Sequence, residues 1–113
     1  MAAKYKIKIE QGTTVRIPLR LKYNDETMDL TGYKARMQIR SSVSSSDVIH
    51  ELTSENGGID IQSNGVIGLY ISAEDTANFD FKTAVYDLEI IAPSLDVVRL
   101  MEGQVTLSHE VTR

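Results

Sequence analysis

Apolar and polar residues alternate one by one along most of this sequence, and this period of two constrains the fold more than any other feature. In residues 4–9, tyrosine and isoleucine take the odd positions while lysine takes the even ones. Residues 15–23 repeat the pattern, with Arg16, Pro18 and Arg20 standing between apolar side chains. Strict alternation is typical of a strand that buries one face, so the sequence predicts two strands here.

The same pattern predicts strands along the rest of the chain. They cover residues 33–40, 48–53, 59–62, 66–72, 84–91 and 97–111. Only the segment that follows Ser72 favours a helical turn, because Ser72 can cap it and Asp75 lies three residues further on. Seven to nine short strands with one helical turn predict an all-β protein, an antiparallel immunoglobulin-like β-sandwich.

Some positions refine this expectation. Pro18 cannot donate a hydrogen bond to a neighbouring strand, so its strand is predicted to lie at a sheet edge or to carry a bulge. Within residues 97–111 the apolar positions change from even to odd, and a bulge near Glu102 and Gly103 would restore the alternation. Tyr86 either donates a hydrogen bond across the corner that follows the helical turn or packs as an ordinary core residue.

The alternation also predicts the core of one domain formed by residues 1–113. A chain of this length buries roughly two thirds of its unfolded surface, which is enough for a core without disulfides. The side chain of Tyr23 is expected to point inward. The residues expected to face one another between the two sheets are Ile17, Leu19, Met37, Ile39, Ile67, Leu69, Ile71, Leu88 and Ile90.

Composition excludes several classes of protein. The sequence has no cysteine, which excludes disulfides and thiolate metal sites. No apolar run approaches the roughly 20 residues of a membrane-spanning helix. The N-terminal residues carry lysines but no apolar core, so we expect no secretory signal. We therefore predict a protein that folds in a reducing cytoplasm and does not enter a membrane.

Catalytic and metal-binding patterns are not found in the sequence. His50 and His109 are the only histidines, whereas a zinc site needs three or four ligands. The serine-rich segment lacks the glycine elbow that positions a nucleophile. Calcium among Asp25, Glu26 and Asp29 stays an alternative, although the EF-hand spacing is absent. We predict that the protein is not an enzyme and has no catalytic, cofactor-binding or metal-binding residues.

Charge is divided unevenly along the chain. Residues 1–40 hold nine Lys and Arg against four Asp and Glu, a balance of +5, whereas residues 41–113 hold three against twelve, a balance of −9. One explanation is that basic strands pair with acidic strands through ion pairs. The other is that a basic face meets an acidic face on a neighbouring copy or a partner. Nucleic acid is not an expected partner, because no aromatic residues lie between the arginines to stack on bases.

The strand that follows the turn at Gly32 has a strongly basic outer face. Lys34, Arg36 and Arg40 share this face, while apolar residues occupy the other. We predict that these three residues lie at a protein–protein interface, with Arg16 and Arg20 as second choices.

Three segments in a fixed order carry a resemblance to a known family. They are "IEQGTTVRIPLRLKYNDETMDLTGYKARMQIR", "GVIGLYISAEDTANF" and "AVYDLEIIAPSLDVVRLMEGQVTLSHEV". In this order, from about Ile7 to Val111, the chain resembles small tail-associated β-sandwich proteins of tailed bacteriophages. It is also similar to the N-terminal domain of phage baseplate upper proteins.

That resemblance implies a virion structural protein of the tail, neck or baseplate. Its expected partners are other virion proteins and further copies of itself, as a homo-oligomer on the particle, and its expected location is the virion after folding in the host cytoplasm. Two alternatives remain at this point. One is a capsid decoration protein that clamps capsid subunits, and the other is a carbohydrate-binding module, although the chain has no tryptophan to stack on sugar rings.

Overall fold

Eleven strands and one short helix make up the described part of the computed structural model, which covers residues 3–23 and 25–112. The strands are β1 (Ala3–Lys4), β2 (Ile7–Glu10), β3 (Val15–Arg20), β4 (Lys22–Tyr23), β5 (Glu26–Thr27), β6 (Lys34–Arg40), β7 (Val48–Thr53), β8 (Ile59–Ile61), β9 (Val66–Ile71), β10 (Thr83–Ile91) and β11 (Val97–Ser108). The helix α1 spans Ala73–Ala77. The side chain of Tyr23 lies outside the described part.

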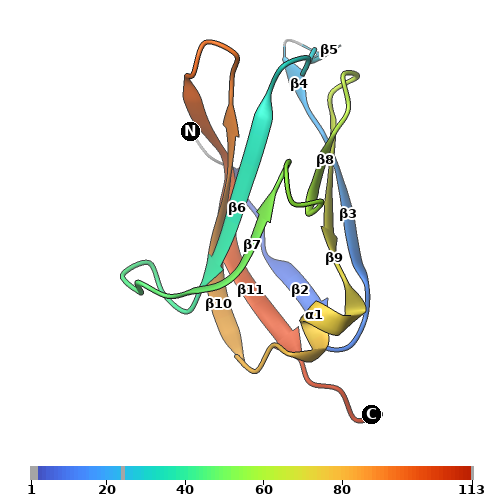
Figure 1. Ribbon diagram of the computed structural model, residues 1–113, viewed down its shortest axis with the longest axis vertical. Coiled ribbons are helices and arrows are strands. Elements are labelled where there is room, and N and C mark those ends of the chain that lie inside the picture. Colours follow the sequence, from blue (N-terminus) through green and yellow to red (C-terminus); the bar gives the residue numbers. More distant parts are fainter. Residues whose placement is uncertain (1–2, 24, 113) are drawn as a thin grey trace.

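Two sheets form the layers of a sandwich, as Figure 1 shows. The larger sheet has the order β1-β11-β10-β6-β7, and β2 also pairs with β11. The smaller sheet has the order β3-β9-β8, while β4 and β5 form a separate hairpin. The prediction of an all-β sandwich is therefore confirmed, and β3 with its Pro18 lies at an edge as expected.

Strand direction differs from the prediction in one respect, because the sandwich is not wholly antiparallel. Both β1 and β2 run parallel to β11, with Ala3 opposite Met101 and Ile7 opposite Val105. The other pairings are antiparallel, including β10 with β11 and β6 with β7. A period of two specifies which side chains share a face, but it specifies neither the partner of a strand nor its direction.

The bulge in β11 lies at a different residue from the predicted one. Leu88 pairs with Met101 and Glu89 pairs with Arg99, which leaves Leu100 as the extra residue. Gly103 stays within the regular pairing, opposite Tyr86. A side chain at position 103 would collide with the carbonyl oxygen of Tyr5, so the glycine serves a close approach of backbone rather than a bulge.

Tyr86 joins the N-terminal strands to the centre of the larger sheet. Its side chain is only 4 % exposed, and its hydroxyl donates a 2.6 Å hydrogen bond to the carbonyl oxygen of Tyr5. Burial, with a smaller contribution from the charge of Tyr5, raises the pKa of Tyr86 to about 12. Tyr86 is therefore a buried core residue whose hydrogen bond differs from the predicted one, because it reaches the N-terminal segment instead of closing the corner after the helical turn.

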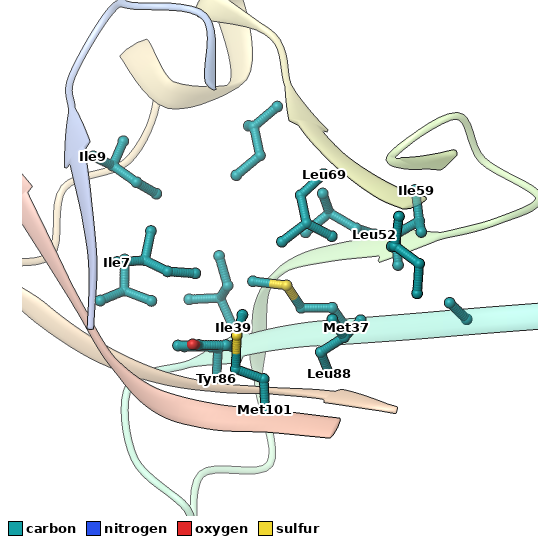
Figure 2. Close-up of a cluster of buried hydrophobic side chains, with 14 of the residues drawn as sticks. Ile7, Ile9, Met37, Ile39, Leu52, Ile59, Leu69, Tyr86, Leu88 and Met101 are labelled. Carbon is teal, nitrogen blue, oxygen red and sulfur yellow. The ribbon is translucent and has the colours of Figure 1, made fainter. Parts of the chain in front are cut away.

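The core lies between the two layers, as Figure 2 shows for part of it. Of the predicted core residues, those on β6, β9 and β10 are buried, while Ile17 and Leu19 on edge strand β3 are partly buried against them. Ile7 and Ile9 of β2 complete the cluster at one end, and Leu52 and Ile59 add to it from β7 and β8. The alternation thus predicted the inward faces correctly.

Helix α1 closes one end of the sandwich. The Ser72 hydroxyl accepts a 3.1 Å hydrogen bond from the backbone N–H of Asp75, which confirms the predicted cap. The fully buried Thr76 hydroxyl accepts from the N–H of Gly12 and donates to the carbonyl of Thr13, so the helix is tied to the β2–β3 turn. No helix in the described residues has the length and apolar character needed to cross a membrane.

Candidate functional site: a charged sheet face and an apolar hairpin tip

The outward side chains of β6, β10 and β11 form one continuous polar surface on the larger sheet. Because inward residues alternate with outward ones, each strand contributes a row of charge to this surface. The name charged face is used here for the residues Lys34, Arg36, Arg40, Asp87, Glu89, Arg99 and Glu102.

Cross-strand ion pairs hold much of the charged face in place. Arg36 Nε lies 2.8 Å from Glu89 Oε1, on strands that pair in register. Arg99 lies between two carboxylates, with Nε 3.5 Å from Asp87 on the neighbouring strand β10 and Nη1 3.5 Å from Glu102 on its own strand. The Arg36–Glu89 pair agrees with the explanation that basic strands pair with acidic strands, whereas Arg99 and its partners all lie in the acidic part of the chain.

Glu102 is the most perturbed carboxylate of the charged face. A 3.2 Å hydrogen bond from Lys4 Nζ is the largest cause, and together with the charges of Lys4 and Arg99 it lowers the pKa of Glu102 below its usual value. Lys4 belongs to β1, so this contact also fastens the N-terminal strand to β11. The pKa shift therefore has a structural explanation.

Two adjacent hollows lie on the charged face and share Gln38 and Asp87. The first, named the Arg40 hollow, has a volume of about 430 Å³. Its lining includes Gln38, Arg40, Val43, Val85, Asp87 and Arg99. The second has a volume of about 420 Å³ and is lined by Arg36, Gln38, Glu51, Asp87 and Glu89. The first hollow is the one that combines apolar side chains with charges.

The three first-choice interface residues all lie on the charged face. Lys34 pairs with Glu55 at 3.7 Å, and Arg36 pairs with Glu89. Arg40 instead donates to two neutral groups at 2.8 Å each, the carbonyl of Ser45 and the side-chain oxygen of Gln38. In the described part of the chain, Arg40 therefore has no carboxylate partner.

The second-choice residues lie on the other layer of the sandwich. Arg16 and Arg20 project from the outer face of β3 in the smaller sheet, where Arg16 stacks over the ring of Tyr70 at 4.6 Å. The structure therefore does not bring the five predicted residues together. Alternation predicted that each of them points outward, but it could not predict which sheet each strand joins.

An exposed apolar tip on the β10–β11 hairpin is a feature that the sequence reasoning missed. Leu95 is 78 % exposed, and Val97 and Val98 are each about half exposed. Leu95 also has a positive φ of 75°. The available signal was the short "PSLD" turn, which places a leucine where such a turn favours glycine or asparagine.

Metal-binding chemistry receives no support from the described residues. The ring of His50 packs edge-on against Phe79 at 5.5 Å, within the sandwich. Asp29, one of the possible calcium ligands, accepts hydrogen bonds from the hydroxyl and the N–H of Thr31, which lower its pKa. Across residues 3–23 and 25–112, no group of three or more His, Cys, Asp or Glu side chains is placed to hold a metal ion.

Comparisons with known proteins identify a shared fold and correct the predicted function. No family model and no curated protein matches the chain. The chain is similar to the crystal structure of CopC from Methylosinus trichosporium OB3b, with 11 % sequence identity and a TM-score of 0.50, over 95 % of this chain and 89 % of that one. At this identity the likeness shows the β-sandwich fold alone.

This finding overturns the prediction of a bacteriophage virion protein, together with its alternatives of a capsid decoration protein and a carbohydrate-binding module. The likeness to CopC covers nearly the full sandwich, 95 % of this chain. The resemblance to phage tail and baseplate proteins is not tested by it, because a shared fold does not specify a function.

Proposed function

We propose that the protein is a non-catalytic building block that associates with further copies of itself through the charged face. The arrangement of charge on that face is the observation that carries the proposal. Cations of β6 and Arg99 of β11 stand on either side of the acidic row formed by Asp87 and Glu89 on β10. A surface that carries both signs can bind a different, complementary surface of a second copy, with its unpaired charge facing an opposite charge there.

The intramolecular contacts of the charged face support this role. Arg36 and Arg99 are already held by carboxylates, so less side-chain freedom is lost when a partner binds. The perturbed pKa values of Tyr86 and Glu102 follow from burial and from Lys4, and neither requires a substrate. Carboxylates among the cations also disfavour a polyanion, so the proposal includes no nucleic acid.

Sedimentation velocity at increasing protein concentration and at several salt concentrations tests the proposal. We expect the average mass to rise with protein concentration at low salt. It should fall as salt increases, because the Debye length shrinks from about 10 Å at 0.1 M to about 3 Å at 1 M. A wild-type protein that stays monomeric at every concentration contradicts the proposal.

A pair of charge-reversal variants locates the interface. Lys34→Glu/Arg36→Glu/Arg40→Glu changes the charged face and is expected to weaken association. The matched control, Arg16→Glu/Arg20→Glu, changes the outer face of the smaller sheet and is expected to retain it. Circular dichroism of both variants checks that each is folded. Loss of association in the control alone would place the interface on the smaller sheet instead.

A further inference from the structure

The tip of the β10–β11 hairpin presents apolar side chains to solvent. A three-residue loop forms the turn, closed by hydrogen bonds from Leu95 N–H to the Ala92 carbonyl at 2.8 Å and from Ala92 N–H to the Asp96 carbonyl at 2.9 Å. Leu95, Val97 and Val98 are all exposed large hydrophobic residues. The name hairpin tip is used here for Leu95, Asp96, Val97 and Val98.

Leu95 occupies a backbone conformation that suits glycine. The loop has the bonding of a type I turn followed by a left-handed residue, and glycine is favoured at that last position because it has no Cβ. Leucine stands there with φ 75°, and its side chain is 78 % exposed. Neither backbone preference nor burial within the chain accounts for a leucine at this position. Residues in such sparsely populated backbone conformations cluster at functional sites, including those that clamp a ligand.

The Arg40 hollow on the charged face complements the hairpin tip in both apolar and charged groups. Val43, which is 89 % exposed, and Val85 offer apolar contacts for a leucine side chain. Arg40 is bonded only to neutral groups, and within the described residues Asp96 makes no ion pair. Among the described residues, Arg40 in the hollow and Asp96 at the tip are therefore two opposite charges without an ion-pair partner, whereas Arg99 in the hollow is already paired with the lining carboxylates Asp87 and Glu102.

We infer that the hairpin tip of one copy binds in the Arg40 hollow of a second copy. Leu95 packs against Val43 and Val85, and Asp96 faces Arg40. The inference rests on the proposed self-association and names the contact that produces it. Because the tip and the hollow are different surfaces, the contact is heterologous and joins copies head to tail, as a ring where the rotation closes.

Two single substitutions test the contact, one in the hairpin tip and the other in the Arg40 hollow. Leu95→Gly removes the apolar side chain and leaves the hollow intact, and glycine is better suited to φ 75°. The folded state is therefore expected to be at least as stable, so lost association cannot be attributed to unfolding. Val43→Glu places a carboxylate in an exposed loop of the hollow, where Leu95 is expected to pack and close to the neighbouring Asp96, and leaves the tip intact. Each variant alone should raise the Kd for self-association by about tenfold or more.

Mixing the two variants provides the decisive measurement. An equimolar mixture of Leu95→Gly and Val43→Glu contains one intact hollow and one intact tip, so it should form 1:1 dimers that do not grow further. Val111→Glu is the control, because Val111 is 91 % exposed and belongs to neither surface, and it should associate like the wild type. Sedimentation velocity of each protein and of the mixture reports these masses.

Failure of this inference can be distinguished from failure of the proposed function. If the wild type associates but both variants associate equally well, self-association stands and this contact is wrong. A mixture that forms no dimer although each variant is monomeric also contradicts the head-to-tail contact. If the wild type does not associate at all, both proposals are wrong.

Discussion

Removing the hydroxyl of Tyr86 tests the connection between the N-terminal segment and the larger sheet most directly. Tyr86→Phe loses the hydrogen bond to the Tyr5 carbonyl, which should lower the free energy of unfolding by about 1 kcal/mol at neutral pH. Urea unfolding followed by far-UV circular dichroism measures this change. An unchanged free energy of unfolding would contradict a structural role for the hydroxyl.

The same phenol predicts a dependence of stability on alkaline pH. Its pKa is raised from the ordinary value of 10.0 to about 12 in the folded protein, so the folded state holds the proton more tightly than the unfolded state. Below pH 10 the phenol is protonated in both states and stability does not depend on its titration; between pH 10 and 12 the free energy of unfolding should fall by about 2–3 kcal/mol as the unfolded state ionises first. Unfolding measured over this range should show a steeper decline for the wild type than for Tyr86→Phe. Equal slopes would contradict the assignment.

At the scale of elements, Gly103 permits the N-terminal strands to pair with β11. Gly103→Ala places a methyl group against the Tyr5 carbonyl, so β1 and β2 must move away from β11. We expect a loss of about 1–3 kcal/mol in the free energy of unfolding. Since both changes act on Tyr5, the losses from Gly103→Ala and Tyr86→Phe should not add.

Gly68 provides a matched control for Gly103, because it also lies inside a strand. A Cβ at Gly68 would meet its nearest neighbour, the Cβ of Asp60, at 3.9 Å, which is ordinary contact. Gly68→Ala should therefore change the free energy of unfolding by less than about 0.5 kcal/mol or increase it. A similar loss for both alanines would show that the approach of Tyr5 is not the cause.

The strands could be predicted from the sequence, whereas their partners could not. Alternation of apolar residues is a local property, so it predicted the inward faces of β3, β6, β9 and β10. The bulge was misplaced because a glycine inside a strand can serve either a bulge or a close backbone approach. At Gly103 the second reason applies, and it depends on a segment that lies far away in the sequence.

At the scale of the whole molecule, Leu69 tests the packing of the two layers against each other. It lies on the central strand of the smaller sheet, and its side chain is buried against the larger one. Leu69→Ala should lower the free energy of unfolding by roughly 2–5 kcal/mol, because the layers cannot fully close the cavity. Val111→Ala, at an exposed position, should stay within about 0.5 kcal/mol. A small loss for Leu69→Ala would contradict the packing of the two layers.

The candidate site was predictable only in part, because the alternation of apolar residues does not specify which strands pair. The sequence placed Lys34, Arg36 and Arg40 on one outward face, and the structure has them there. Their partners depend on strand register, which brings Glu89 opposite Arg36 across more than fifty residues of sequence. The conformation of Leu95 depends on the turn geometry, and the sequence pattern did not reveal it.

Parallel pairing of the first strands with the last one affects how the chain folds during synthesis. Residues 3–10 leave the ribosome well before their pairing partners at residues 101–108. Until those partners are made, β2 has no strand to pair with, and one edge of β10 stays open. Such late, non-local pairing slows folding and exposes nascent chains to aggregation. We therefore expect translation arrested before β11 to yield a chain that chaperones bind and proteases cleave.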